Sequence, residues 1–201
     1  VVLVTGPAGS GKSRLGAETV LAPRVDLRGV RTREGLIQRV AATLDLKIPA
    51  ETPGWWWNAV LPPVVVLDDA EGVVPWLARV LERTRGTVVV TSRVRFEAGA
   101  VIEVGPLNQD EALALVREIR TEPTAELEAL VASVDRLPLV LEVVAGSDQP
   151  MANLHEQLAG SALEDALQLS WDLLDVHARR TLAAMATFRG SLGLEDLAAV
   201  A

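Results

Sequence analysis

The sequence predicts an α/β domain built on a parallel sheet, followed by a region that contains only helices. Short apolar runs alternate with helix-like segments up to about residue 105, and only helical periodicity follows Gly105. Continuous apolar strands separated by helices are typical of a parallel sheet covered on both faces. We therefore expect an α/β domain over 1–105, a small all-α domain over 106–148 and a third domain over 149–201.

The apolar runs define five strands, and the segments between them define the helices. The expected strands are "VVLVT" (1–5), "RVDL" (24–27), "VVVLDDA" (64–70), "GTVVVTSR" (86–93) and "AVIEV" (100–104). Helices are expected from Lys12 to about Leu21, after the N-cap Thr32, and from Pro75. Asn108 with Glu111 predicts a capping box. Helical spacing recurs at Leu127–Val134, in "LPLVLEVVAG" (137–146) and at Leu163–Leu174.

Composition excludes several classes of protein. The net charge of -8 argues against a nucleic-acid-binding surface, and residues 151–201 carry seven acidic side chains against three arginines. The absence of cysteine excludes disulfides and thiolate metal sites. No apolar stretch approaches the roughly 18 residues that span a bilayer. The chain starts at Val1 and stops within a helical pattern, so we expect a segment of a longer protein. From the absence of cysteine, the short apolar stretches and the acidic charge, we expect a cytoplasmic protein that binds neither membrane nor nucleic acid.

"GPAGSGKS", residues 6–13, matches the phosphate-binding pattern G-x-x-x-x-G-K-[ST] between a predicted strand and a predicted helix. Glycines let successive N–H groups point at phosphate oxygens, and the helix presents its positive end to the same anion. Lys12 is expected to reach the β- and γ-phosphates, and the Ser13 hydroxyl to hold Mg²⁺. The alternative is an ordinary glycine turn before a helix. The predicted nucleotide-binding residues are Gly6, Pro7, Ala8, Gly9, Ser10, Gly11, Lys12, Ser13 and Arg14.

Two later strands end in polar side chains that suit the same chemistry. Asp68 and Asp69 follow a buried strand, where Asp68 is expected to orient the magnesium through a water and Asp69 to position or deprotonate the attacking water. A strand end that is merely solvated is the alternative. Arg93 follows the next strand and can read the γ-phosphate, distinguishing ATP from ADP. The alternatives are that it only solvates the strand end or pairs with Glu97.

These motifs, with "VGPLNQDEALAL" and "RLPLVLEVVAG", stand in the order and spacing of the STAND signalling ATPases, the NB-ARC or apoptotic-type group. The chain most resembles bacterial members fused to transcription-regulator or tandem-repeat domains, and "LSWDLLDVHARRTLAAMATFRGSLGLEDL" is similar to the start of the family's winged-helix domain. The resemblance implies an α/β P-loop NTPase of the additional-strand type, with the "TSR" strand between the loop strand and the "LDD" strand. It also implies that Arg93 senses the γ-phosphate and that Pro138 packs against adenine and sugar.

The resemblance implies a switch that binds ATP or ADP with Mg²⁺, hydrolyses ATP slowly, and opens and self-associates in the ATP-bound form. Two other functions remain open. One is a working ATPase of the AAA+ kind with rapid turnover. The other is a non-hydrolysing scaffold in which the loop only stabilises the fold.

"GWWWN", residues 54–58, is a separate feature. Consecutive side chains point about 100° apart on a helix and about 180° apart on a strand, so Trp55, Trp56 and Trp57 cannot all enter one core. The two interpretations are partial burial beneath the loop that leads to the third strand, and a docking surface for a missing domain or a neighbouring protomer.

Overall fold

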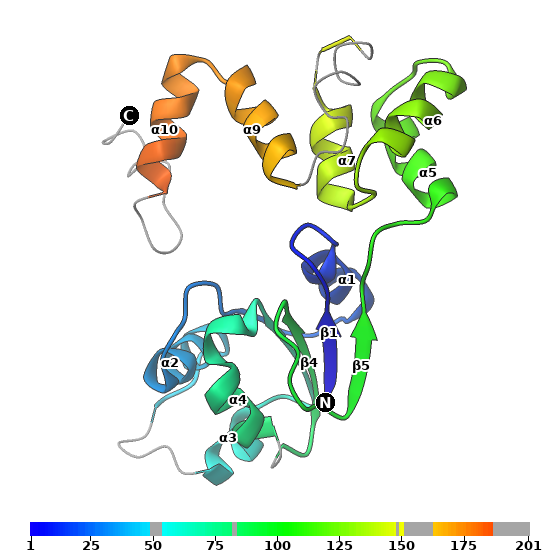
Figure 1. The fold of residues 1–201 in the computed structure, drawn as a ribbon. Helices are drawn as coiled ribbons and strands as arrows, with labels where there is room; N and C mark the ends of the chain where they lie inside the picture. Colours follow the sequence, from blue (N-terminus) through cyan, green and yellow to red (C-terminus); the bar gives the residue numbers. More distant parts are fainter. Residues whose placement is uncertain (49–53, 82–83, 148, 151–162, 187–201) are drawn as a thin grey trace. The chain divides into compact units, whose positions relative to one another are not determined.

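The computed structural model describes residues 1–48, 54–81, 84–147, 149–150 and 163–186. The chain forms two compact units, Val1–Val104 and Gly105–Ala201 (Figure 1). The expected boundary after residue 105 lies beside this division. The further division at 148/149 stays a prediction.

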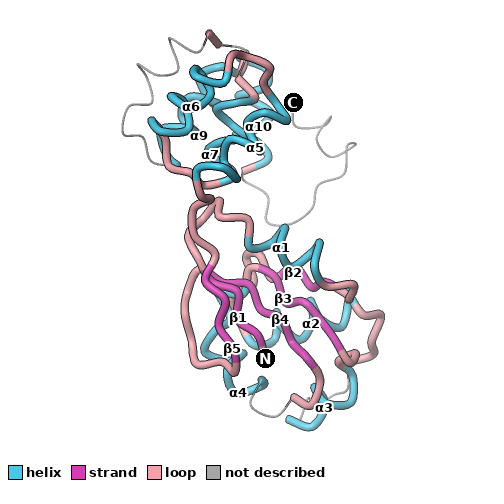
Figure 2. Tube along the Cα trace, turned by 90° about the vertical axis from the view of Figure 1, so that its right-hand side faces the viewer, coloured by secondary structure: helices cyan, strands magenta, loops and turns pink. Residues whose placement is uncertain are grey.

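The first unit contains a five-stranded parallel sheet. Its strands are β1 (Val2–Thr5), β2 (Arg24–Asp26), β3 (Val64–Asp68), β4 (Thr87–Ser92) and β5 (Ala100–Glu103). They lie side by side in the order β2-β3-β4-β1-β5, and every neighbouring pair is parallel (Figure 2). The strand that carries "TSR" thus lies between the loop strand and the "LDD" strand, which is the order that the resemblance implies.

Helical segments connect the strands: α1 (Lys12–Thr19), α2 (Arg33–Thr43), α3 (Gly54–Val60), the 3₁₀ turn η1 (Ala70–Val73) and α4 (Val74–Leu81). Helices α1, α2 and α4 lie at the predicted places, whereas α3 and η1 are not among the predicted elements. The predicted N-cap is confirmed, since the Thr32 hydroxyl accepts a hydrogen bond from the Gly35 N–H at 3.0 Å. Helix α1 ends at Thr19 rather than at Leu21, because Val20 is extended and packs against the sheet beside Val4 and Val66.

Alternate residues of β1, β3 and β4 enter two different cores. Leu3, Val65 and Val88 face a large core that α2, α3 and α4 complete. Their neighbours Val4, Val66 and Val89 form a smaller core on the other face. Helix α1 covers this second face at Gly16, where an added Cβ would already touch Val66 at 3.5 Å. The expectation of a sheet covered on both faces is confirmed.

The tryptophan run forms helix α3, and two of its rings are in the large core. Trp56 and Trp57 are each 4% exposed and meet edge to face, with ring centroids 5.0 Å apart. Their burial agrees with the first of the two interpretations. The side chain of Trp55 lies outside the described residues.

The described part of the second unit contains helices as its regular elements. They are α5 (Gln109–Ile119), α6 (Thr124–Ser133), α7 (Pro138–Ala145), α9 (Leu163–Leu173) and α10 (Val176–Met185). The predicted capping box is present: the Asn108 side chain accepts from the Glu111 N–H, and the Glu111 carboxylate accepts from the Asn108 N–H. Apolar side chains of α5, α6 and α7 form one core, with Val116, Leu130 and Leu141 fully buried.

Arg120 joins the end of α5 to the end of α7. Its guanidinium donates to the carbonyls of Ala145 (2.8 Å), Ser147 and Gln149 (3.0 Å), and it pairs with Glu122 at 2.6 Å. Ala145 is the last residue of α7, and Ser147 and Gln149 follow it, so helix geometry provides no donors for these carbonyls. The side chain therefore fixes the direction in which the chain leaves α7.

The winged helix expected over 149–201 stays a prediction, because residues 151–162 and 187–201 lie outside the described residues. Within the described ranges, every helix falls short of the length and apolar character that a membrane crossing requires.

Candidate nucleotide-binding site

Three adjacent strands bring the predicted site residues to one edge of the sheet. Strands β1, β3 and β4 are neighbours and parallel, so their carboxyl ends lie together (Figure 2). The glycine-rich loop follows β1, Asp68 and Asp69 lie at the end of β3, and Arg93 follows β4. Ligands of open α/β sheets bind at this edge.

The loop after β1 has a backbone that only glycine can follow. Gly9 and Gly11 have φ angles of 75° and 90°, in the left-handed region. A Cβ on Gly6 would stand 2.1 Å from the carbonyl oxygen of Val104, a distance that no side chain tolerates. Gly11 caps α1, so the turn directs the chain straight into the helix whose N-terminus carries the partial positive charge.

Lys12 bends back over its own loop. Its Nζ donates to the carbonyl oxygen of Pro7 at 2.7 Å, and the residue is buried. Burial lowers the pKa of Lys12, and the nearby Glu71 carboxylate opposes this shift. Ser10 lies in the same loop, where its Oγ is buried and finds no hydrogen-bond partner among the described residues.

Asp68 is fully buried and has three partners. The Thr91 hydroxyl donates to Oδ1 at 2.5 Å, and an Arg24 Nη donates to Oδ2 at 2.5 Å. Burial alone would raise the pKa of Asp68, but hydrogen bonds from Thr91, Arg24 and Ser13 outweigh it and hold the pKa below its ordinary value. Asp68 is therefore a carboxylate at neutral pH, in contact with the Ser13 hydroxyl, and its magnesium role stays a prediction.

Asp69 shares a hydrogen bond with a second carboxylate, that of Glu71. Asp69 has a left-handed backbone (φ 58°) and starts the 3₁₀ turn η1, which carries Glu71. The hydrogen bond with Glu71, together with burial, raises the pKa of Asp69 to about 6. Burial would raise the pKa of Glu71 as well, but hydrogen bonds from Asp69 and Arg93 bring it down to about 2. Between about pH 2 and pH 6, the two groups hold one proton between them, on Asp69. Nε of Arg28, an exposed side chain, lies 3.7 Å from Oδ2 of Asp69.

Arg93 pairs with Glu71 and not with Glu97. Its backbone N–H and its Nε donate to the same carboxylate oxygen of Glu71, at 2.8 and 2.9 Å. The hydrogen bond and charge of Glu71 raise the pKa of Arg93 above its ordinary value. The alternative that Arg93 pairs with Glu97 is wrong, because η1 places Glu71 directly beside the end of β4.

The remaining predicted residues lie elsewhere. Arg14 is on the exposed side of α1, where its Nε donates to Glu18 at 2.8 Å. Pro138 is the first residue of α7, in the second unit, and its contact with adenine and sugar stays a prediction.

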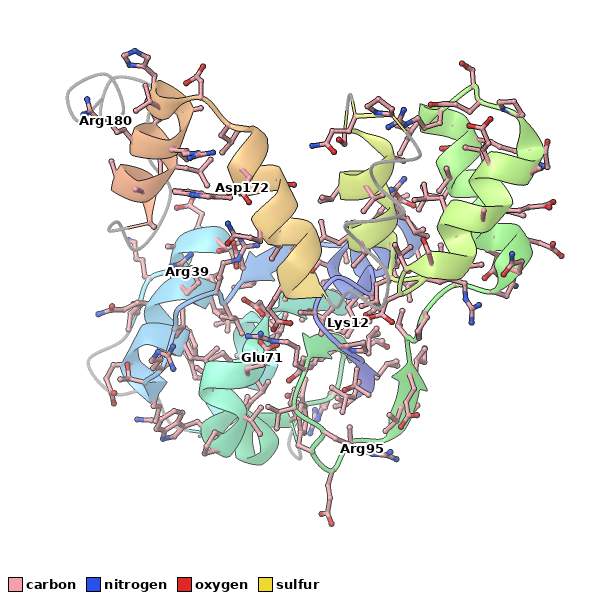
Figure 3. The ribbon with its side chains drawn as sticks, turned by 45° about the horizontal axis from the view of Figure 1, so that its top comes forward. Lys12, Arg39, Glu71, Arg95, Asp172 and Arg180 are labelled. Atoms are coloured by element: carbon pink, nitrogen blue, oxygen red, sulfur yellow. The ribbon has the colours of Figure 1, made fainter. Side chains whose placement is uncertain are left out.

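Three residues of the site were not singled out by the sequence as partners: Arg24, Glu71 and Thr91. Arg24 and Asp68 are 44 residues apart, and Glu71 and Arg93 are 22 apart, so no local pattern joins them. Position was a signal for Thr91 and Glu71, which lie near the carboxyl ends of β4 and β3, but not for Arg24, which is the first residue of β2. Lys12 and Glu71 are labelled in Figure 3.

The residues present fit a nucleotide with Mg²⁺. The unpartnered Ser10 Oγ, the glycine backbone of the loop and the N-terminus of α1 suit phosphate oxygens. The Ser13 hydroxyl and the Asp68 carboxylate are hard oxygen donors of the kind that Mg²⁺ prefers.

Comparison with known proteins gives structural neighbours only. No family model matches the chain, and no curated protein matches it. A STAND protein with a tetratricopeptide-repeat sensor from Pyrococcus horikoshii is similar over 98% of this chain, with a TM-score of 0.73 and 17% identity. This chain spans 33% of that protein. A Walker-type ATPase from Pyrococcus abyssi is similar over 92% of this chain and 70% of its own length, with a TM-score of 0.52 and 14% identity. These likenesses show that the chain has the α/β fold of P-loop NTPases.

Proposed function

We propose that the chain is the nucleotide-controlled part of a STAND-type signalling ATPase, of the NB-ARC group and the branch associated with bacterial transcription regulators. It binds ATP or ADP with Mg²⁺ and hydrolyses ATP slowly. The difference between the ATP-bound and the ADP-bound form controls opening and self-association. The observation that carries the proposal is the meeting of Lys12, the Ser13–Asp68 pair and Arg93 at one edge of the sheet. The phosphate-binding motif and the neighbouring folds support it.

The loop binds the phosphates. Its N–H groups and Ser10 Oγ donate to phosphate oxygens, and Lys12 exchanges the Pro7 carbonyl for the β- and γ-phosphates. Ser13 and Asp68 would hold Mg²⁺, which neutralises charge on the phosphates during transfer. Asp69, next along the chain, positions or deprotonates the attacking water.

Arg93 distinguishes the nucleotides. A guanidinium at this edge gains a charge-assisted hydrogen bond to a γ-phosphate and none to ADP. With ADP, the helical domains close over the nucleotide, and Pro138 packs on adenine and sugar. With ATP, the open form self-associates. We place the protein in the cytoplasm, with effector and sensor domains outside this segment and no direct binding of nucleic acid or membrane.

The first experiment identifies and counts the nucleotide released when the freshly purified protein is denatured. A resting switch releases close to one ADP per chain, and Lys12→Ala releases none. Lys47→Ala, an exposed lysine away from the loop, is the matched control and retains the nucleotide.

Steady-state turnover and partner binding separate the alternatives. Rapid ATP turnover that needs an arginine from a second protomer indicates the AAA+ kind of ATPase. Unchanged partner binding by a folded Lys12→Ala protein indicates the non-hydrolysing scaffold. Equal affinities for ATP and ADP in the unaltered protein contradict the sensing role of Arg93.

A further inference from the structure

Glu71 makes the closest contacts of Arg93, although none of the roles above uses it. It lies on η1, two residues after Asp69, and its side chain is 16% exposed. One of its carboxylate oxygens accepts two hydrogen bonds from Arg93, from the backbone N–H at 2.8 Å and from Nε at 2.9 Å. Both lengths are typical of charge-assisted bonds.

These two bonds fix different parts of Arg93. The bond to the backbone N–H holds the chain just beyond the last residue of β4, and the bond to Nε fixes the plane of the guanidinium. The Arg93 side chain is 58% exposed, so packing contributes little to its orientation. Its Nη atoms form no hydrogen bond to the described residues, which leaves the outer end of the fork available to an anion.

The pair belongs to the phosphate end of the site. The pKa of Lys12 responds to the charges of four nearby groups, those of Glu71, Arg93, Asp69 and Asp68. All five groups therefore lie within one electrostatic cluster. Glu71 therefore restrains Arg93 beside the lysine that the loop motif assigns to the β- and γ-phosphates.

We propose that Glu71 is a positioning residue that holds Arg93 toward the γ-phosphate and thereby sets the preference for ATP over ADP. This inference rests on the proposed function, because it requires that Arg93 read the γ-phosphate. Glu71 itself does not touch the nucleotide. Its acceptor oxygen, more than its charge, performs the task, because both bonds from Arg93 end on that oxygen.

A competing role for Glu71 predicts the opposite change in the preference for ATP over ADP when Glu71 is removed. If Glu71 held Arg93 as a substitute anion, γ-phosphate binding would have to break the pair. Removal of Glu71 would then strengthen ATP binding relative to ADP. Under the positioning role, removal leaves the guanidinium free to rotate, and the ATP preference falls.

The test measures dissociation constants of the 201-residue chain for ADP and for a non-hydrolysable ATP analogue, both with excess Mg²⁺. The ratio of the two constants is the readout, because a general effect of charge or folding on the site changes both constants together. The variants are Arg93→Ala, Glu71→Ala, Glu71→Gln and the double variant. Glu97→Ala, an exposed acid near Arg93 in the sequence, is the matched control.

We expect Arg93→Ala to lower the preference for the ATP analogue about tenfold, the loss of one hydrogen bond to a charged group. Glu71→Ala lowers it by about threefold or more, while Glu71→Gln, which keeps the acceptor oxygen, stays within about twofold of the unaltered chain. The double variant equals Arg93→Ala, because Glu71 acts through Arg93. If Glu71→Ala does not fold, Glu71→Met replaces it, with the same length and no acceptor.

The other possible outcomes separate the sensing role of Arg93 from the positioning role of Glu71. An unchanged ratio in Arg93→Ala refutes the sensing role itself and, with it, this inference. A lowered ratio in Arg93→Ala beside an unchanged ratio in Glu71→Ala overturns only the role of Glu71. A raised ratio in Glu71→Ala, or a loss in Glu71→Gln as large as in Glu71→Ala, also overturns positioning by the acceptor oxygen.

Discussion

Thr91 is the side chain whose removal should damage the site most without changing its shape. Its hydroxyl donates to Asp68 Oδ1 at 2.5 Å and accepts from the Asp69 N–H at 3.0 Å, and the residue is 1% exposed. Thr91→Val keeps the volume and removes both bonds. A hydrogen bond to a charged group contributes about 1.5–3 kcal/mol and a neutral one about 0.5–1.5 kcal/mol. Because Arg24 and Ser13 still hold Asp68, we expect a loss of about 2–4 kcal/mol in the free energy of unfolding.

Urea unfolding followed by tryptophan fluorescence measures this loss. Four of the five tryptophans lie in the first unit, and Trp171→Phe removes the fifth, so the signal reports the unit that contains Thr91. Thr87→Val makes the same chemical change at an exposed position of the same strand and should change the free energy by less than about 0.5 kcal/mol. Equal effects of the two substitutions would refute the reasoning.

The pH dependence gives a second check on Thr91. The pKa of Asp68 is lowered by folding, so its contribution to stability is present above the unfolded value of 3.8 and is lost as the pH falls through the folded value. Thr91→Val removes part of that shift. The difference between the variant and the unaltered chain should therefore narrow as the pH falls below 3.8. A difference that stays constant would assign the loss to packing and not to the carboxylate.

Three further predictions concern other contacts. Gly6→Ala should abolish nucleotide binding and lower the melting temperature, because its Cβ meets the Val104 carbonyl at 2.1 Å, whereas Gly105→Ala, with nothing within 4 Å, should be neutral in both measurements. Asp69→Asn should stabilise the chain at neutral pH: the folded pKa of about 6 exceeds the ordinary 3.8, so the stabilisation by Asp69 is complete below 3.8 and lost as the pH rises through about 6. The asparagine keeps a donor for Glu71, so the urea midpoints of the variant and the unaltered chain should converge at low pH. Midpoints that stay apart at low pH would contradict the predicted stabilisation. Arg120→Met should cost the second unit about 2 kcal/mol in thermal unfolding, against little change for the exposed Arg117→Met.

The sequence was sufficient where a local pattern determines the structure. The run "GPAGSGKS" predicts a turn whose glycines need positive φ angles, and the structure has them at Gly9 and Gly11. Asn108 predicts its helix start because the capping box is formed by residues three apart. The run "GWWWN" does not distinguish helix from strand and does not indicate which rings are buried, because the burial of Trp56 and Trp57 depends on their contacts with the sheet.

The parts of the site that escaped prediction depend on one unusual backbone angle and on long-range pairs. Asp69 has a φ of 58°, which aspartate adopts more readily than most residues but which no motif requires here. That angle turns the chain into η1 and brings Glu71 to the end of β4. The separation of Glu71 and Arg93 along the chain, 22 residues, does not by itself indicate that the two side chains meet.

The complete set of partners around Asp68 has a consequence for how the protein uses its ligand. Arg24, Thr91 and Ser13, all groups of the chain itself, compensate the buried carboxylate, so the position of Asp68 at this edge of the sheet is fixed by the protein's own hydrogen bonds. A site that must fold around its ligand loses part of the binding free energy to ordering. A preformed site of this kind leaves that free energy for shifting the balance between conformations of the chain.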